Sequence, residues 1–411
     1  MLDDLYALSR TFIKLRNRPF RRSFLASHPL TARLSIIIGQ RGIGKTTAMI
    51  QHLLDSCAGD PLTDKALYLQ ADHFLMANRS LYEIAEEFHN LGGELLCLDE
   101  IHKYPDWSRE LKSITDTFPA LRVVASGSSA LEVSRGSHDL SRRAVVHRMY
   151  GMSFREYIAL ASGIELPAAM LPDMLSNHVR LTDRIVSELA AKGDKVLALF
   201  RDYLTCGYYP YFVEYTDRSL FGLTLEQHVH TTLEVDLPAI HPALNGTSIK
   251  KISRLLTAIA GMVPFAPDLK SLRTMLDISD DRTLKTYLQY LEDAGVILTV
   301  SKSGKGLKAM AKPDKIYLNN PNLFYALFRG TEPDSGAMRE TFFLNMLRSG
   351  YEVTVPQRGD FLVNGSFTFE VGGKGKGFRQ VAGIEDSYLA LDGIEAGNGR
   401  TVPLWLFGFL Y

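Results

Sequence analysis

The stretch "GQRGIGKT", which begins at Gly39, constrains the fold of this chain more than any other feature. Its residues follow the spacing G-x-x-x-x-G-K-[ST]. The apolar run "LSIII" (34–38) comes directly before it, and the residues from Gly44 to about Asp55 have a helical pattern. A buried strand, a glycine-rich loop and a helix in this order form the structure that binds a phosphate group. The alternative is a glycine-rich turn beside a surface lysine.

The residue types of this loop suit a nucleotide phosphate. Its glycines let successive backbone N–H groups turn inward around the β-phosphate, and the start of the helix adds partial positive charge. Lys45 reaches the β- and γ-phosphates in such loops, and the hydroxyl group of Thr46 coordinates Mg²⁺. We therefore expect ATP and Mg²⁺ as ligands. The predicted ATP-binding residues are Gly39, Gln40, Arg41, Gly42, Ile43, Gly44, Lys45, Thr46 and Thr47.

A pair of acids, Asp99 and Glu100, ends the apolar stretch "ELLCLDE". An aspartate at the end of a buried strand is costly unless it meets a cation or several hydrogen-bond donors. Beside a phosphate loop we expect Asp99 to hold Mg²⁺ through water, and Glu100 to polarise the attacking water as general base. The alternative is a strand that ends in two solvated acids. With both motifs in order, the sequence predicts that ATP is bound and hydrolysed.

Short apolar runs alternate with helical patterns in this part of the chain, which predicts a parallel sheet covered on both faces and an α/β fold class. The predicted strands are 34–38, 66–71, 94–99 and 121–127. Ser126 and Ser128 follow the last of these runs, between the strand of the phosphate loop and the acid pair. We expect them to sense the γ-phosphate or to orient the water, although serine and glycine also form ordinary turns.

Three arginines of the stretch "DLSRRAVVHRMYGMSFREY" are candidates for a cation that stabilises the transition state. They are Arg142, Arg143 and Arg148. An arginine of this kind, supplied by the same chain or by another, raises the rate by orders of magnitude. Ordinary surface charge is the alternative for each of them.

The stretch 250–300 has three helical patterns, and Gly295 ends the last of them. A strand, the lysine-rich turn "SKSGKGLKAMAK" and a second strand, "KIYLN", follow. Three helices and a two-stranded wing form a winged helix. Basic residues gather at 302–315 and at 10–22, which favours contacts with the phosphates of DNA or RNA. A solvated helix face and a lysine-rich loop are the alternative.

These stretches together resemble a large bacterial and archaeal family of AAA-type ATPases with a C-terminal domain of unknown function. The resemblance runs through nearly the whole chain in the family's order. It rests on "GQRGIGKTT", "LLCLDEIHKYPDWSRELK", "VVASGSSAL", "DLSRR", "YGMSFREYI", "YLTCGYYPYFVEY", "KIYLNNPNLFYAL" and the C-terminal acids. It implies an AAA-like P-loop ATPase domain at 1–160, a helical lid or linker at 161–245, a winged helix at 246–330, and a small α/β restriction-endonuclease-like domain at 331–411.

The family's site residues carry over position by position. Its ATP site matches Lys45, Thr46, Asp99 and Glu100, and its transition-state arginine matches Arg143. The family commonly has glycine before that arginine. Here Arg142 takes the place of the glycine, which changes the local turn.

The resemblance also implies a second metal site in the C-terminal region. Nucleases of the restriction-endonuclease fold hold one or two divalent metals with a helix glutamate, an aspartate that opens a strand, and a glutamate on the next strand. Glu340, Asp360 and Glu370 match these roles. The apolar alternation around the last two predicts a hairpin that places them side by side.

The lysine of this nuclease pattern is displaced. Gly372 stands two residues after Glu370, where the nucleases have lysine. We expect the glycines to bulge the strand and to return Lys374 to the site, with Gln380 as a further polar contact. An active metal-dependent nuclease, a degenerate nuclease fold that still binds nucleic acid or partners, and a purely structural module all remain open.

Composition indicates a globular protein outside the membrane. Hydrophobic residues make up 46% and charged residues 22%, and the formal net charge is zero. The start, "MLDDLYALSR", has acids where a signal peptide needs positive charge, and the three cysteines match no metal spacing. We therefore expect a cytoplasmic protein without a membrane partner.

The function predicted from these features is an ATP-hydrolysing protein that associates with DNA or RNA. In this prediction the nucleotide state sets the position of the winged helix and of the nuclease-like domain. The alternative is a nucleotide-dependent signalling switch that regulates a protein partner without nucleic acid, which the zero net charge favours. Assembly into a homo-oligomer is left open.

Overall fold

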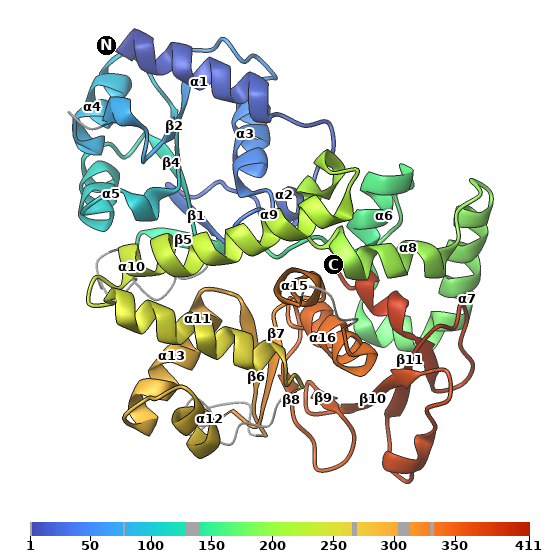
Figure 1. Ribbon diagram of the computed structural model, residues 1–411. Coiled ribbons are helices and arrows are strands. Elements are labelled where there is room, and N and C mark those ends of the chain that lie inside the picture. The colour runs from blue at the N-terminus through green and yellow to red at the C-terminus, as the bar shows by residue number, and fades with distance from the viewer. Residues whose placement is uncertain are drawn as a thin grey trace. The chain divides into compact units, whose positions relative to one another are not determined.

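The computed structural model describes residues 2–76, 79–128, 140, 142–264, 269–302, 313–328 and 333–411. The chain forms two compact units, coloured along the sequence in Figure 1. The first unit comprises 1–150 and 231–245, and the second comprises 151–230 and 246–411. A short segment from the middle of the sequence thus folds with the N-terminal part. The predicted boundaries at 160, 245 and 330 stay a prediction.

The first unit is built on a five-stranded sheet in the order β2-β3-β4-β1-β5. Every pairing in it is parallel. The strands are β1 (Leu34–Ile38), β2 (Ala66–Gln70), β3 (Leu95–Asp99), β4 (Arg122–Gly127) and β5 (Ala144–Arg148). The four predicted strands and their parallel arrangement are confirmed. Strand β5 was missed because it is a half-exposed edge strand, and its alternating residues lack the continuous apolar run of a central parallel strand.

Helices follow the strands of the first unit, as parallel pairing requires. They are α1 (Leu2–Arg16), α2 (Phe24–Ser27), α3 (Lys45–Ser56), η1 (Phe74–Met76), α4 (Leu81–Asn90), η2 (Ile101–Lys103), α5 (Trp107–Thr117), the π-helical turn η6 (Thr232–Asp236) and α10 (Leu237–Ile240). Ser80 and Glu83 form a capping box that starts α4. The core is continuous from the strands to α1, α4 and α5. Helix α3, predicted from Gly44 to about Asp55, is confirmed.

The second unit begins with helices. They are α6 (Phe154–Ser162), α7 (Leu171–Ala190), α8 (Val196–Asp202), the π-helical turn η4 (Tyr203–Gly207), η5 (Pro210–Glu214) and α9 (Arg218–Thr231). The π-helical turn has a specific partner in this unit. The buried amide of Asn322 donates to the carbonyl oxygens of Tyr203 and Leu204, at 3.0 and 2.8 Å. It thereby satisfies backbone groups in a turn that departs from α-helical geometry.

Three helices and a two-stranded sheet come next in the second unit. They are α11 (Gly246–Ala260), α12 (Leu269–Met275), α13 (Asp281–Asp293), β6 (Ile297–Val300) and β7 (Lys315–Leu318). The side chain of Asp280 caps α13, because its Oδ1 accepts from the Thr283 N–H at 2.8 Å. The two strands are antiparallel. This is the order of elements predicted for the winged helix. Most of the predicted lysine-rich turn lies outside the described residues.

The last part of the second unit is a small α/β sheet. Its elements are α15 (Asn322–Leu327), α16 (Ser335–Leu347), β8 (Val353–Thr354), β9 (Phe361–Val363), β10 (Phe367–Gly373), η7 (Phe378–Gln380), β11 (Ser387–Asp392), β12 (Thr401–Pro403) and η8 (Leu404–Phe409). The order is β12-β11-β10-β9-β8. Strands β8, β9 and β10 pair antiparallel, whereas β11 and β12 continue the sheet in parallel. The predicted hairpin is confirmed as β9 and β10. None of the helices in the described ranges has the length and apolar character needed to span a membrane.

Candidate active site

The phosphate loop connects the end of β1 to the start of α3, as the sequence predicts. Gly42 and Gly44 have φ values of 83° and 98°, in the left-handed region where glycine carries no Cβ penalty. A Cβ at Gly39 would collide with the carbonyl oxygen of Met149. Glycine at these three positions is therefore required by the backbone itself. The N-terminus of α3 points its free N–H groups into this loop.

Arg22 supports the loop from behind, which the sequence did not indicate. Its side chain is buried and donates to the carbonyl oxygen of Ile43 at 2.8 Å and to that of Tyr150 at 3.0 Å. Two other members of the basic run at 10–22 form ion pairs, Arg10 with Asp64 and Arg21 with Asp55. This part of the run is therefore committed to contacts within the chain.

Lys45 lies at the first position of α3 with only 5% of its surface exposed. Its ammonium group donates to the carbonyl oxygens of Gly39 and Gln40, both at 2.8 Å. Burial lowers the pKa of Lys45, and the charges of Glu100 and Asp99 oppose that shift. The ammonium is thus folded onto its own loop, where it can exchange carbonyl oxygens for phosphate oxygens.

Both oxygens of the Asp99 carboxylate accept hydrogen bonds from neighbouring groups of the site. Its Oδ2 accepts from the hydroxyl groups of Thr46 and Tyr68, both at 2.7 Å. Its Oδ1 accepts from the Ser126 hydroxyl and from the Glu100 N–H. Because the Thr46 hydrogen is committed to Asp99, the lone pairs of Thr46 Oγ1 are left for a metal ion. This arrangement fits Mg²⁺ bound directly by Thr46 Oγ1, with Asp99 acting on the ion indirectly, through its hydrogen bond with Thr46.

Two of these contacts refine the predicted roles. Ser126, predicted to sense the γ-phosphate, binds Asp99 and accepts from the Glu100 N–H at 3.2 Å, so in the structure it orients the acid pair. Tyr68 was missed because it stands inside the apolar run of β2. Burial raises the pKa of Tyr68, and the charge of Asp99 raises it further. Its hydroxyl group is therefore a permanent donor.

Glu100 stands apart from Asp99 in both backbone and surroundings. Its φ is 54°, a left-handed conformation that costs a non-glycine residue about 1 kcal/mol or more. Its Oε2 lies 3.6 Å from the ammonium of Lys103 and 3.8 Å from a guanidinium nitrogen of Arg41. These cations attract the carboxylate without a short hydrogen bond. Glu100 is therefore partly exposed and placed where its carboxylate can meet a water molecule.

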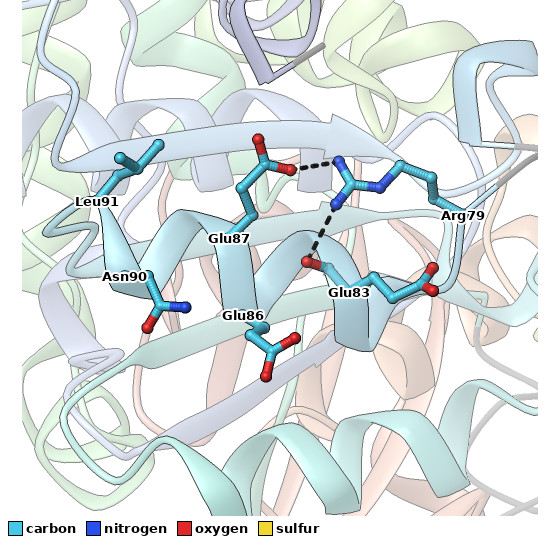
Figure 2. Close-up of a pocket in the computed structure, with 6 residues that line it drawn as sticks. All are labelled: Arg79, Glu83, Glu86, Glu87, Asn90 and Leu91. Carbon is cyan, nitrogen blue, oxygen red and sulfur yellow. Dashed lines mark hydrogen bonds and ion pairs between the residues drawn. The ribbon is translucent and has the colours of Figure 1, made fainter.

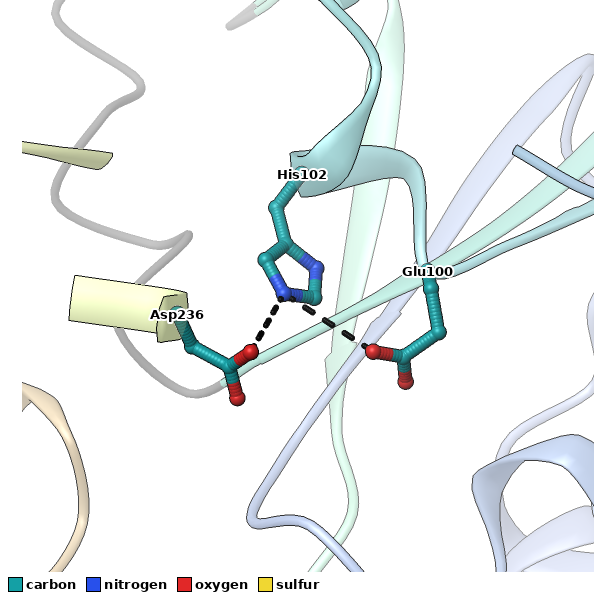
Figure 3. Close-up of side chains that lie close together, drawn as sticks. All are labelled: Glu100, His102 and Asp236. Carbon is teal, nitrogen blue, oxygen red and sulfur yellow. Dashed lines mark ion pairs between the residues drawn. The ribbon is translucent and has the colours of Figure 1, made fainter. Parts of the chain in front are cut away.

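A second carboxylate, Asp236, reaches this site from the turn η6. Figure 3 shows it beside His102 and Glu100. His102 Nε2 lies 3.4 Å from Asp236 Oδ1 and 3.8 Å from Glu100 Oε2. Arg41 donates to both oxygens of Asp236, at 2.9 and 3.2 Å. Sequence reasoning missed His102 and Asp236, and it assigned Arg41 only to phosphate binding.

The predicted residues Ser128 and Arg143 have clear places in the first unit. The Ser128 N–H donates to Nδ1 of His102 at 3.4 Å, so Ser128 acts on the histidine beside Glu100. Arg143, the predicted transition-state arginine, pairs with Asp116 at 2.6 and 3.0 Å. Its guanidinium is therefore engaged away from the acid pair, and the role assigned to it stays a prediction.

The second unit brings the C-terminal acids together around a lysine that sequence reasoning missed. The ammonium of Lys315, on β7, lies 3.5 Å from Glu340 Oε2 and 3.8 Å from Asp360 Oδ1. Tyr317, on the same strand, donates to Glu340 Oε2 at 2.8 Å. Burial raises the pKa of Glu340, and the charge of Asp360 raises it further. Glu340 and Asp360 are thus close enough to repel each other across the lysine.

Glu370 is fully buried on β10, and its lysine partner is Lys376. In the structure Lys376, and not the predicted Lys374, contacts this carboxylate, and the role of a nuclease lysine stays a prediction. A Cβ at Gly372 would lie 2.7 Å from Cβ and Cγ of Lys376, so the glycine makes room for the returning lysine stem. The predicted polar contact of Gln380 is present, since its amide nitrogen can be placed 2.9 Å from Glu370 Oε2. Burial raises the pKa of Glu370, against the pull of the Lys376 hydrogen bond.

An open hollow lies elsewhere on the first unit, along α4. Figure 2 shows its lining of one arginine, three glutamates, an asparagine and a leucine. Arg79 there pairs with Glu87 at 2.7 Å and donates to the Glu83 carbonyl oxygen at 3.2 Å. None of the residues predicted to act lines this hollow, and its arginine is paired with Glu87 of α4.

Comparison with known proteins agrees with the geometry of the first unit. Residues 31–158 match the family model of an AAA domain. That range contains the phosphate loop, the acid pair and β1 to β5, so the predicted α/β fold class with an AAA-like P-loop core is confirmed. Mixed helical and small-sheet regions follow it. Residues 197–334 match a domain of unknown function, which ends before α16 and the C-terminal sheet.

Similar proteins were found in both sequence and structure. An uncharacterized protein of Methanocaldococcus jannaschii is 26% identical over 299 residues, which are 69% of this chain and 60% of that protein. The Hsp104–ADP complex of Saccharomyces cerevisiae is 16% identical, with 70% of this chain and 38% of that chain covered and a TM-score of 0.26. AMPPCP-bound DnaA from Aquifex aeolicus is 14% identical, with 71% and 88% covered and a TM-score of 0.25.

Proposed function

We propose that the first unit binds ATP with Mg²⁺ and hydrolyses it at the phosphate loop. The observation that carries this proposal is the 2.7 Å hydrogen bond from Thr46 to Asp99. It joins the start of α3 to the end of β3, so that the phosphate loop and the acid pair form one site. The match of residues 31–158 to an AAA domain supports the same activity.

Each residue of the site has a distinct part in the proposed reaction. Lys45 and the N–H groups of the loop bind the phosphates, and Thr46 and Asp99 hold the metal ion. The bound Mg²⁺ neutralises charge on the phosphate oxygens during transfer. Glu100 accepts a proton from the attacking water. Ser126 links the two acids, since its hydroxyl group donates to Asp99 and accepts from the backbone N–H of Glu100.

The Mg²⁺ dependence of hydrolysis tests this assignment. Thr46→Ala removes one metal ligand, and the loss of a hydrogen-bonding group beside a charge costs about 1.5–3 kcal/mol. We expect the Mg²⁺ concentration for half-maximal hydrolysis to rise at least roughly tenfold. Thr46→Ser keeps the hydroxyl group and serves as the matched control. An unchanged Mg²⁺ requirement in Thr46→Ala would remove Thr46 from the metal site.

We also propose that the C-terminal sheet holds a divalent metal ion and acts on nucleic acid. Three observations support a metal site. Half-buried Glu340 has a raised pKa, it faces Asp360, and Lys315 lies between the two carboxylates. Close carboxylates at a buried site call for a cation. Lys315 supplies one in this structure, so a metal ion competes with its ammonium group for the same oxygens.

Helix α13 supports the nucleic-acid part of this proposal. Its buried residues face the unit, namely Leu284, Tyr287, Leu288 and Leu291. Arg282 is exposed, and Lys285 and Gln289 are half-buried on the remaining surface of the helix. Basic side chains on an exposed helix face suit contacts with phosphates and with base edges. A protein partner on this face would instead favour the signalling-switch alternative.

Thermal unfolding with Mn²⁺ tests the second metal site. A ligand that binds only the folded protein stabilises it by RT ln(1 + [L]/Kd), about 2.7 kcal/mol at 100 times Kd. The measurement is made in Lys45→Ala to silence the nucleotide site. We expect 10 mM Mn²⁺ to raise the melting temperature of this variant by roughly 2–4 °C for each kcal/mol of stabilisation. Adding Asp360→Asn should abolish the shift, and an equal shift in both proteins would contradict the site.

A further inference from the structure

We propose that Asp236 is a positioning residue that reports the state of the nucleotide site. In the structure it holds Arg41 of the phosphate loop, and we infer that Arg41 exchanges Asp236 for phosphate oxygens when a nucleotide binds. The turn η6 is then released from the loop. This inference rests on the proposed nucleotide site, and it adds a residue and a regulatory segment to it.

The position of Asp236 in the chain is the first reason. It belongs to the segment 231–245, which folds into the first unit although the residues on both sides of it, 151–230 and 246–411, form the second unit. The segment is therefore a covalent link from the nucleotide site into both neighbouring stretches of chain. A change in its contacts at Asp236 is passed on through the backbone.

The contacts of Asp236 are the second reason. Its side chain is 2% exposed and touches two groups of the nucleotide site, Arg41 and His102. Burial alone raises the pKa of a carboxyl group, yet the hydrogen bond with His102 and the charge of Arg41 outweigh it and lower the pKa of Asp236. A buried carboxylate that stays ionised needs these partners. Losing Arg41 therefore changes the stability of the whole turn.

His102 keeps one contact of Asp236 in place during such an exchange. Its Nδ1 accepts from the Ser128 N–H, and its Nε2 faces Asp236 and Glu100. The histidine thus stands between the two carboxylates. When Arg41 leaves Asp236, His102 remains as its partner and couples it to the proposed general base.

The same three side chains offer ligand atoms within 4.8 Å of one another, as for a metal ion. The two carboxylates among these side chains, Glu100 and Asp236, already lie beside cationic groups of the chain. Arg41 lies 2.9 Å from Asp236 and 3.8 Å from Glu100, and Lys103 lies 3.6 Å from Glu100. A metal ion would have to displace the guanidinium nitrogen of Arg41 that donates to both oxygens of Asp236. The charges present favour an exchange of partners by Arg41 over a metal centre.

Competition for Arg41 predicts the direction in which each variant changes the affinity for nucleotide. If Asp236 competes with phosphate for the guanidinium group, Asp236→Asn should bind a fluorescent ADP analogue about three- to tenfold more tightly than the wild type, about 0.7–1.4 kcal/mol. Arg41→Ala should bind it more weakly, and Asp236→Asn should have no further effect in the Arg41→Ala background. A merely structural Asp236 predicts equal or weaker binding in Asp236→Asn. Asp64→Asn, which breaks the exposed pair with Arg10, is the control.

Hydrogen exchange of the wild-type chain tests the release of the segment directly and needs no variant. We expect a non-hydrolysable ATP analogue with Mg²⁺ to protect the phosphate loop and, at the same time, to speed amide exchange at 232–245. Protection of the loop with unchanged exchange at 232–245 would overturn this inference and leave the nucleotide site intact. Absence of nucleotide binding to the wild type would instead refute the proposed function.

Discussion

Glu100→Gln should hydrolyse ATP about 100- to 10,000-fold more slowly than the wild type, the usual contribution of a general base. Its affinity for the nucleotide should stay within roughly threefold, because the phosphate loop and Asp99 are unchanged. Glutamine has nearly the same shape as glutamate but cannot accept a proton from water. Among the described residues the partly exposed carboxylate has the longer contacts to Lys103, Arg41 and His102, so its loss breaks no short hydrogen bond within that part of the chain. Single-turnover hydrolysis and equilibrium binding separate the two effects.

Glu94→Gln is the matched control for this variant. Glu94 precedes β3, at the opposite end of the strand from Glu100, and its exposed side chain pairs with Lys65 at 2.7 Å. The same chemical change there should leave hydrolysis within about twofold, since an exposed ion pair contributes about 0–1 kcal/mol. Normal turnover by Glu100→Gln would show that another residue accepts the proton.

Lys45→Ala should weaken nucleotide binding by roughly 30-fold or more, because truncating one partner of a buried charge pair costs about 2–5 kcal/mol. Hydrolysis should fall below detection at ordinary ATP concentrations. In the absence of nucleotide the ammonium group donates to the carbonyl oxygens of Gly39 and Gln40 of its own loop, so the variant should still fold. Binding is measured with a fluorescent nucleotide and folding by thermal unfolding.

Lys65→Ala provides the lysine control in the same unit. Lys65 is exposed and pairs with Glu94 away from the loop, so its removal should change neither binding nor hydrolysis. If Lys45→Ala bound nucleotide as tightly as Lys65→Ala, the phosphate loop would not be the nucleotide site.

The core of the nucleotide site could be predicted because its residues follow predictable strands. Lys45, Asp99 and Ser126 each stand at or beyond the carboxyl end of a parallel strand, and these ends meet at one edge of the sheet. The order of strands, with β4 between β1 and β3, places Ser126 beside the acid pair as expected. The spacing of the phosphate loop and the apolar runs of the strands were therefore enough to predict the core of the nucleotide site.

The residues that were missed reach the site from distant segments. Arg22 and Asp236 belong to no motif, and only the tertiary fold brings them to the loop. A buried arginine in a basic run has the same local sequence as an exposed one, so the run at 10–22 suggested phosphate contacts or a solvated helix face and not the buried role of Arg22. Asp236 stands in a helical stretch whose pattern carries no sign that it folds with the N-terminal part.

In the C-terminal cluster of Glu340, Asp360 and Glu370, the spacing of residues in the sequence did not predict which lysine lies beside the acids. The three acids were expected in this order along the chain, and the hairpin of β9 and β10, predicted from alternation, is present. Lys374 was expected to return to Glu370, yet the turn after β10 carries Lys376 there instead. The geometry of a glycine-rich turn depends on backbone angles that residue types alone do not determine.

Phosphate release from ATP by the purified wild-type chain tests the central claim most directly. It should be measured with Mg²⁺ and with excess EDTA, alongside Lys45→Ala purified in parallel. We predict release that requires Mg²⁺ and is lost in the variant. If the wild type neither bound nor hydrolysed ATP, or if the variant released phosphate at the same rate, the loop from Gly39 to Thr47 would not be an ATP-hydrolysing site.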